Sequence, residues 1–312
     1  MIERNIQLIL IKSELGAGTY GANLGIEAIK FAAMKADSDL FREYDIIHLD
    51  CPDEYLYAPE RSPHARSIEL ILKLYQKIAD RIEDSLMCGN FPFIISGDHS
   101  NAGGTIAGIR KAYPDKRLGV IWIDAHADIH SPYTTPSGNL HGMPLAASLN
   151  LQTENPLLNQ PDLSTKRSWA RLCNVGDVAP KIEATDLVLV DIRDCEAPEW
   201  ELIKRLNIKY FEPSDLNSLG AKEVANQTLQ YLAGCDFIYV SFDIDSMDAE
   251  LVPGTGTPVT NGMNFEQTDT LLQAFWASEK LISMEFTEIN PLLDVKNQTA
   301  EIAFRLISNL VK

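Results

Sequence analysis

The chain has 312 residues, 45% of them hydrophobic, which is enough to bury the core of one large α/β domain or of two small ones. Its 44 acidic residues outnumber its 27 basic ones, and the net charge of -17 would repel nucleic acid and anionic membrane surfaces. Its five cysteines are widely spaced without a CxxC pair, and no apolar run reaches the roughly 18 residues that span a bilayer. We therefore expect a cytoplasmic protein with neither nucleic acid nor a membrane as a partner.

Along the chain, short apolar runs alternate with longer amphipathic segments, which is typical of β-α units around a parallel sheet. Strands are predicted at 5–11, 45–49, 93–96, 118–124, 172–176, 187–191, 208–211, 237–243 and 281–286. Helices are predicted at 65–87, 223–233, 265–276 and 298–310, where apolar residues recur every three or four positions. The sequence thus predicts an α/β fold, with no internal repeat and no low-complexity linker.

Three of the predicted strands lead into polar motifs. The segment 96–100, SGDHS, follows one strand, and its glycine lets the backbone turn tightly enough to present His99. The segment 124–128, DAHAD, places potential ligands at every second position, and alternate side chains of an extended chain share a face. A third strand ends in the acidic pair Asp243 and Asp245. The predicted metal ligands at these three strand ends are His99, Asp124, His126, Asp128, Asp243 and Asp245.

Four carboxylates in one cleft would repel one another, so the cluster requires compensating positive charge, which two divalent ions would supply. Oxygen-rich ligation with a minority of imidazole favours Mn²⁺, and it leaves Zn²⁺, Fe²⁺ and Co²⁺ open. Two metals that share carboxylates can lower the pKa of a bridging water and position it for attack. Each motif alone is more often a cap or a turn. Together, at three strand ends, they predict a metal-dependent hydrolase.

Two loops rich in Thr, Ser, Gly and Pro, at 132–142 and 252–262, each follow closely on a strand with an acidic end. Open α/β sheets bind ligands beyond the carboxyl ends of their strands, so we expect both loops to border the site. The segment 16–21, GAGTYG, lacks the GxGxxG order of a dinucleotide fold and is interpreted as a turn. Trp122 and Phe242 lie inside strands that adjoin the metal motifs, and we expect them to be core residues.

GDHS, DAHAD and SFDID, in this order and spacing, closely resemble the ureohydrolase family of arginases and agmatinases. The resemblance covers nearly the whole chain and extends to the segments TTPSGNLHG at 134–142, PGTGTP at 253–258 and EINP at 288–291. It implies a single domain over residues 1–312, with three layers and a central, mainly parallel, eight-stranded sheet flanked by helices. Because arginase-like proteins commonly form trimers or hexamers, it also implies a homotrimer or homohexamer.

The resemblance implies two Mn²⁺ per chain. One ion, or a bridge between the two, would be served by His99, Asp124, Asp128 and Asp243, and the second ion by His126, Asp245 and the bridging carboxylates. The implied catalytic residues are His141, Glu288 and Asp128. Glu288 matches the carboxylate that receives the guanidinium, a planar cation that pairs bidentately with carboxylates. His141 matches the proton-shuttling histidine, because expelling an amine requires protonating it. Without the metal motifs, His141 would be interpreted as a loop residue bonded to backbone, and Glu288 as part of a solvated turn.

Departures from the family concern the contacts to the amino and carboxylate ends of the substrate. Arginases usually have Asn where this chain has His130, and Glu196 stands where a shorter Asp is usual. Both changes keep the chemistry, since an imidazole can donate to a carboxylate and a glutamate can accept from an ammonium. The predicted substrate-binding residues are His130, Thr135, Ser137, Asn139, Asp194 and Glu196. A smaller departure is Ser96, where the family commonly has a second Gly.

The resulting hypothesis is hydrolysis of L-arginine to L-ornithine and urea, by attack of a metal-bridging hydroxide on the guanidinium carbon. The alternative within the family is a ureohydrolase for agmatine, guanidinobutyrate or formiminoglutamate. A binding or regulatory protein that kept the fold is expected to have lost a ligand, and none of the six is missing. A single-zinc amide hydrolase would need fewer carboxylates than this chain supplies.

Overall fold

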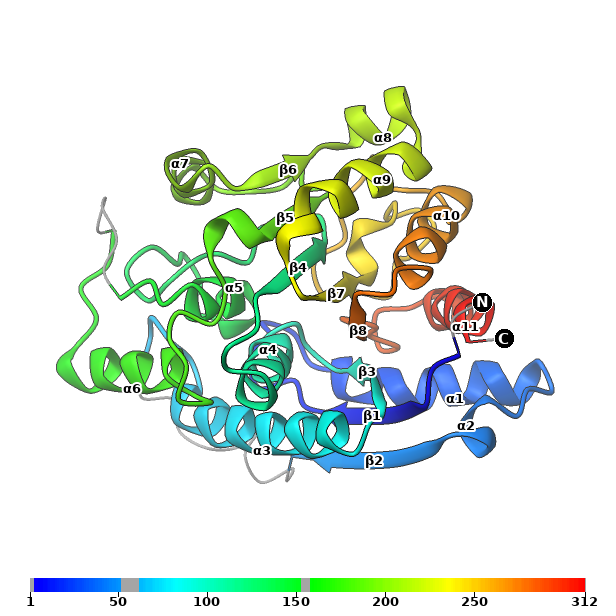
Figure 1. Cartoon of the computed structure of the whole chain (residues 1–312), viewed down its shortest axis with the longest axis horizontal. Coiled ribbons are helices and arrows are strands. Elements are labelled where there is room, and N and C mark those ends of the chain that lie inside the picture. The colour runs from blue at the N-terminus through cyan, green and yellow to red at the C-terminus, as the bar shows by residue number, and fades with distance from the viewer. Residues whose placement is uncertain (1–2, 52–61, 153–157, 312) are drawn as a thin grey trace.

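The computed structural model describes residues 3–51, 62–152 and 158–311 (Figure 1). In this part of the chain, eight strands form one sheet in the order β2-β1-β3-β8-β7-β4-β5-β6, and every strand pairing is parallel. The strands are β1 Ile6–Lys12, β2 Asp45–Asp50, β3 Phe91–Ser96, β4 Leu118–Ile123, β5 Leu187–Val190, β6 Lys209–Phe211, β7 Phe237–Asp243 and β8 Leu281–Thr287. The expected eight-stranded sheet between helices is confirmed.

Helices connect the strands, as a parallel sheet requires. They are α1 Gly25–Lys35, α2 Leu40–Glu43, α3 Ile68–Met87, α4 Asn101–Ala112, α5 Pro144–Ser148, α6 Leu163–Cys173, α7 Ala197–Leu206, α8 Pro213–Leu219, α9 Ala221–Tyr231, α10 Phe265–Trp276 and α11 Gln298–Leu310. Side chains cap the starts of α6 and α10, because Asp162 accepts from the Thr165 N–H and Asn264 from the Gln267 N–H.

One predicted strand is wrong. The run 172–176 contains the last turn of α6 and the residues that follow it, and it is not a strand. Leu172 and Cys173 are buried on the same face of this helix as Trp169. A short apolar run looks the same in a buried strand and at the end of an amphipathic helix, so its periodicity could not separate the two.

Both faces of the sheet are covered by helices (Figure 1). On β1, Leu8 and Leu10 belong to one buried cluster with residues of α1, α9, α10 and α11. Ile9 and Ile11 belong to a second cluster with residues of α3, α4, α6 and α7. The two-residue period of a strand therefore sends successive side chains into two cores, which explains why the strands are continuous apolar runs.

The strand order brings the sequence motifs together. β3, β8, β7 and β4 are neighbours at the centre of the sheet, although they lie far apart in the sequence. Their carboxyl ends carry His99 after β3, Glu288 after β8, Asp243 at the end of β7 and Asp124 after β4. Since parallel strands end at the same edge, the fold alone places these four side chains at one end of the sheet.

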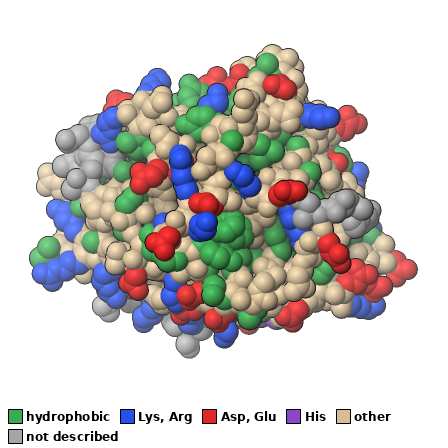
Figure 2. All heavy atoms as spheres, in the orientation of Figure 1, with side chains coloured by type: hydrophobic (Ala, Val, Ile, Leu, Met, Phe, Trp, Pro, Cys, Tyr) green, Lys and Arg blue, Asp and Glu red, His purple; other side chains and the backbone are tan. Residues whose placement is uncertain are grey.

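The outer surface shows charges of both signs. On the face drawn in Figure 2, acidic and basic side chains are interspersed among apolar ones. In the ranges that the structure describes, no helix combines the length and the apolar character that crossing a membrane requires.

Candidate metal centre

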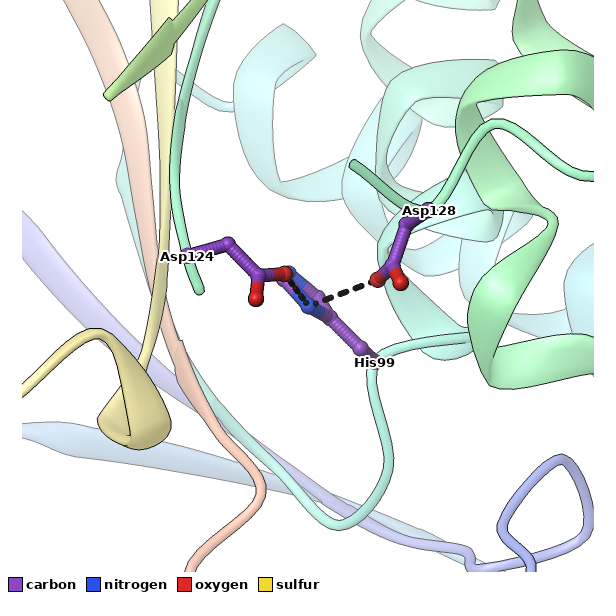
Figure 3. A group of neighbouring side chains, drawn as sticks. All are labelled: His99, Asp124 and Asp128. Atoms are coloured by element: carbon purple, nitrogen blue, oxygen red, sulfur yellow. Dashed lines mark ion pairs between the residues drawn. The ribbon is translucent and has the colours of Figure 1, made fainter. Parts of the chain in front are cut away.

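His99 lies in the turn after β3 and is 1% exposed. Its Nδ1 is 3.0 Å from Asp124 Oδ2, 3.1 Å from Asp128 Oδ2 and 3.1 Å from Asp243 Oδ2. Figure 3 shows the imidazole between Asp124 and Asp128, with its nitrogen directed at both carboxylates. Within the described residues, Nδ1 makes no hydrogen bond of good geometry, despite these three short distances. This nitrogen and three carboxylates therefore converge on one point.

A second group shares Asp124 with the first. His126 Nδ1 is 3.4 Å from Asp124 Oδ1 and 3.1 Å from Asp245 Oδ2. Asp124 thus turns one carboxylate oxygen to each histidine, as a ligand that bridges two ions would. Asp124 Oδ1 also accepts a hydrogen bond from the backbone N–H of His126, at 2.7 Å. The structure brings all six predicted ligands together in these two groups.

The pKa values in the two groups are shifted in the directions expected for carboxylates that lack a compensating cation. Burial and the neighbouring Asp124 raise the pKa of Asp128 to about 6. Burial also raises the pKa of Asp243 well above its usual range. Burial alone would lower the pKa of His99, but the surrounding carboxylates outweigh it and hold this pKa well above the ordinary value. Either a proton on His99 Nδ1 or divalent ions would compensate the negative charge of the carboxylates. The oxygen-rich donor set with two imidazoles fits two divalent ions.

Two residues of the site have left-handed backbone. Asp128 has φ 49° and Glu288 has φ 64°, which is uncommon for residues with a side chain. Hydrogen bonds hold both conformations, since Leu145 N donates to Asp128 O and Glu288 N donates to Gly97 O. Such conformations occur preferentially at functional sites. The sequence carries no signal for them, because neither position is a glycine.

His141 and Glu288 meet beside the first group. Glu288 Oε1 lies 3.2 Å from His141 Nδ1 and accepts from the His99 N–H at 2.9 Å. Burial would lower the pKa of His141, but Glu288 outweighs it and raises this pKa to about 9. The turn at 16–21 borders the site as well, because His141 N donates to Gly16 O and Gly16 N donates to Asp98 Oδ2.

A cavity of about 290 Å³ opens next to the two groups. Its lining includes His141 and each of the predicted substrate-binding residues, namely His130, Thr135, Ser137, Asn139, Asp194 and Glu196. Thr135 shapes the loop, because its Oγ1 accepts from Gly138 N at 2.9 Å. Asn139 Oδ1 is buried and lacks a hydrogen-bond partner within the described ranges. Glu288 is not part of the lining, since its Oε1 faces His141 and His99 N instead.

The two departures from the family pattern contact each other. His130 Nε2 is 2.9 Å from Glu196 Oε2, and His130 Nδ1 is 3.1 Å from Thr134 Oγ1. Glu199, which the sequence reasoning missed, is buried 3.5 Å from His130 Nε2. Glu196 and Glu199 form the capping box of α7, and two acids three residues apart, one just before a helix and one in its first turn, would have been a signal for it. The hydrogen bond from His130 lowers the pKa of Glu196 to about 2.

Trp122 and Ser241 also serve the site, although the sequence reasoning assigned neither to it. Trp122 is fully buried, which confirms the core prediction, but its Nε1–H donates to Asp124 Oδ2 at 2.9 Å. Its ring stacks on His99, with ring centroids 3.9 Å apart. His99 Nε2 lies 2.8 Å from Ser241 Oγ. Strand alternation could have found both, because Trp122 and Ser241 each precede a predicted ligand, Asp124 or Asp243, by two positions.

Comparison with known proteins agrees with this geometry. A model of the arginase family matches residues 4–312. The chain is 33% identical to an arginase from Brevibacillus brevis, over 99% of this chain and 98% of that one. It is similar in structure to the arginase from Bacillus caldovelox, with a TM-score of 0.83 and 31% identity over 99% and 98% of the two chains. The structure of the Entamoeba histolytica arginase in complex with L-ornithine gives a TM-score of 0.83 at 28% identity, over 98% and 97%.

Proposed function

The chain belongs to the arginase family, and on that premise we propose that it hydrolyses L-arginine to L-ornithine and urea with two Mn²⁺ ions. The observation that carries the proposal is the convergence of two imidazoles and four carboxylates beside a polar cavity. Ureohydrolase activity follows from family membership. Arginine as the substrate, manganese as the metal and the role of each residue are the proposal.

The two groups described above divide the ions between them. His99 would hold one ion with Asp128, and His126 would hold the other with Asp245, while Asp124 and Asp243 serve the first ion or bridge the pair. When bound, two such ions neutralise the carboxylates and lower the pKa of a water molecule, which supplies the nucleophile. The chain's own task is to present six ligand atoms from three strand ends without rearrangement.

Glu288 and His141 would act on the guanidinium. The arginine side chain carries a planar cation that a carboxylate binds through two parallel hydrogen bonds. In the structure, His141 takes the place of such a cation, 3.2 Å from Glu288 Oε1. A guanidinium at Glu288 would weaken that pairing and lower the pKa of His141 from about 9. His141 could then release a proton to the departing amine, which is the step that the C–N cleavage requires.

The α-ammonium and α-carboxylate groups of arginine would contact the loop at 132–142. Ser137 and Asn139 line the cavity, and their hydroxyl and amide groups can hydrogen-bond the carboxylate of an amino acid. Glu196 offers an acceptor for its ammonium at the cavity wall. These contacts support an amino-acid substrate over a simple guanidine.

Urea release after manganese loading tests the proposal, with arginine compared against agmatine, guanidinobutyrate and formiminoglutamate. We expect arginine to have the highest kcat/KM. Glu288→Gln should lower kcat/KM by at least about 100-fold while two ions remain bound, because it removes the charge that receives the guanidinium. If none of the four compounds is turned over by manganese-loaded wild type, the proposal is wrong.

A second candidate is a ureohydrolase for a guanidino compound without an α-ammonium group. The hydrogen bond between His130 and Glu196 favours it, because Glu196 already has a donor where an ammonium would bind. Guanidinobutyrate carries a carboxylate but no ammonium, so it would leave that pair intact. A higher kcat/KM for guanidinobutyrate than for arginine would establish this alternative.

We further infer one catalytic domain per chain, assembled as a homotrimer or homohexamer in the cytoplasm. The single sheet that runs through the described residues supports the one domain. The five cysteines are widely spaced in the sequence without a CxxC pair, which suits a reducing compartment. Light scattering of the purified chain would give the number of subunits, and a monomer would contradict the assembly.

A further inference from the structure

Glu285 is a fully buried carboxylate in the middle of β8, outside the two metal-ligand groups. Three hydroxyl groups from three elements surround it. Its Oε1 accepts from Ser96 Oγ at 2.6 Å, and its Oε2 accepts from Thr105 Oγ1 at 2.8 Å and from the Tyr239 hydroxyl at 2.6 Å. The described part of the chain provides no Lys, Arg or His ion pair to it. A buried carboxylate in this setting is costly, so its retention calls for a reason.

A chain of hydroxyl groups leads from Glu285 to the metal centre. Tyr239 and Ser241 are two positions apart on β7 and therefore face the same side of the sheet. The Ser241 hydroxyl lies beside the Tyr239 hydroxyl and favours the ionised form of that phenol, and Ser241 Oγ lies 2.8 Å from His99 Nε2. The connection thus runs from Glu285 through Tyr239 and Ser241 to His99. It reaches the side of the imidazole that faces away from the three carboxylates.

The hydrogen-bond capacity of each group fixes the direction of this chain. Glu285 accepts from all three hydroxyl groups, so Tyr239 donates its single proton to this carboxylate. The tyrosine oxygen is then left to accept from Ser241, and the serine oxygen is left to accept from His99. The proton that His99 would keep on binding a metal ion therefore belongs on Nε2, which leaves the Nδ1 lone pair for the point where Asp124, Asp128 and Asp243 converge.

We propose that Glu285 is a positioning residue for the metal centre: through Tyr239 and Ser241 it sets the tautomer and orientation of His99. Metal-binding histidines commonly donate their second N–H to a carboxylate, and here two hydroxyl groups stand between the two. The inference rests on the proposed metal centre but not on the identity of the substrate. It also explains the serine at position 96, because its hydroxyl holds the other oxygen of the same carboxylate.

Two variants form a matched pair for the test. Tyr239→Phe and Ser96→Ala each remove one hydroxyl donor from Glu285, but only Tyr239→Phe interrupts the path to His99. Mn²⁺ affinity is measured without substrate, from the electron paramagnetic resonance signal of the free ion. We expect Tyr239→Phe to weaken one of the two Mn²⁺ sites by about tenfold or more, and Ser96→Ala to change both by less than about twofold. Glu285→Gln, which keeps an acceptor but removes the charge, should fall between them.

Thermal unfolding of the metal-free variants separates this role from packing alone. A packing role predicts that Tyr239→Phe and Ser96→Ala both lower the melting temperature and leave Mn²⁺ affinity equal to that of the wild type, and this result would overturn the proposal. In the Zn²⁺-loaded protein, the ¹⁵N shift of His99 Nε2, measured with selectively labelled histidine, should change in Tyr239→Phe and not in Ser96→Ala, and an unchanged shift in Tyr239→Phe would also overturn it. Urea release by the wild type is assayed in parallel, so failure of the proposed substrate is registered separately.

Discussion

His130 is the residue whose substitution tests the proposed substrate most directly. His130 Nε2 lies 2.9 Å from Glu196 Oε2, and both residues line the cavity where we place the amino end of arginine. His130→Asn would free Glu196 for the substrate ammonium. We expect the KM for arginine to fall by about fivefold, equivalent to about 1 kcal/mol, with a smaller change in kcat. A contact far from the reacting carbon contributes binding to ground state and transition state alike, which is why KM is the parameter that should change.

Steady-state kinetics with guanidinobutyrate provide the control for His130→Asn. This compound has no ammonium for Glu196 to bind, so its KM should not fall in the variant. A change in kcat alone for arginine would contradict the role assigned to His130.

Lys181 gives a stability prediction away from the metal centre. It is 3% exposed, its Nζ donates to Cys173 O, and burial lowers its pKa to about 8. An unfolded lysine has a pKa of about 10.4, so between these values the unfolded chain binds the extra proton. The free-energy cost of burying the charged Lys181 in the folded chain is therefore fully present below about pH 8, and it disappears as the pH rises toward about 10. Burial raises the pKa of the Cys173 thiol to about 12, which keeps that group neutral in this window.

Lys181→Met should therefore be more stable relative to the wild type at neutral pH than at high pH. We expect the difference in free energy of unfolding to shift by up to about 3 kcal/mol between pH 7 and pH 10. Denaturant unfolding at several pH values measures it. Lys77→Met, at an exposed position of α3, controls for the loss of one lysine. A difference that does not vary with pH would show that Lys181 is not a buried charge.

At the scale of residues, the convergence of the six candidate ligands could be predicted from the sequence, because they lie at or just after the ends of three strands and those of DAHAD alternate with alanines. Glu199 and Ser241 could not be assigned in the same way. Glu199 contributes through a helix that begins after β5, and Ser241 sits within a strand whose alternate residues also fill the core. Their roles depend on how distant elements are packed, which a single sequence does not record.

Among the elements, the strands could be predicted better than the connections between them. A strand buried on both faces is a continuous apolar run, and the six inner strands match their predictions closely because the run ends where the side chains leave the core. The two edge strands, β2 and β6, are only partly buried, and their predictions also held. The run at 172–176 was the error, since a helix end on the core has the same composition. Strand order could not be read from the sequence, because it depends on which helices cover which face.

The loop at 132–142 depends on one glycine. Gly138 has φ 78°, and an added Cβ would collide with the backbone carbonyl of Pro63. The Gly138 carbonyl also accepts from Arg66 N at 2.8 Å, so Gly138 packs closely against the backbone of the segment 63–66. Gly138→Ala should displace Ser137 and Asn139 and raise the KM for arginine by about tenfold or more, since both residues line the cavity.

Gly89 supplies a matched control for that change. It also has φ 78°, but an added Cβ would meet nothing within 4 Å. Gly89→Ala therefore has the same left-handed backbone cost, about 1 kcal/mol, without the collision. Its KM and kcat should equal those of the wild type. If the two variants had the same kinetics, the shape of this loop would not matter for substrate binding.

For the whole molecule, the sheet concentrates negative charge at one edge. Four candidate-ligand carboxylates and Asp98 are buried there, while the face drawn in Figure 2 mixes charges of both signs. These clustered carboxylates should lower the stability of the metal-free chain, because groups arranged for a metal centre repel one another when the metal is absent. Metal binding should therefore act on the stability of the entire chain.

Two buried carboxylates allow the pH dependence of that effect to be worked out. Burial raises the pKa of both Asp98 and Asp128 to about 6, and an unfolded aspartate has a pKa of about 3.9. Between these values the folded metal-free chain binds more protons than the unfolded chain. The stability that these protons provide is present at low pH and is lost as the pH rises through about 6. Metal ions replace the protons above that pH and compete with them below it.

We therefore expect Mn²⁺ to raise the melting temperature by several degrees more at about pH 7.5 than at about pH 5. Differential scanning calorimetry of chelator-treated and reloaded protein measures the gain at each pH. Asp128→Asn removes one repelling charge and keeps a residue type that tolerates left-handed backbone. In the metal-free state it should be more stable than the wild type at the higher pH and no more stable at the lower one. An equal gain from Mn²⁺ at both pH values would mean that carboxylate repulsion is not what the metal ions relieve.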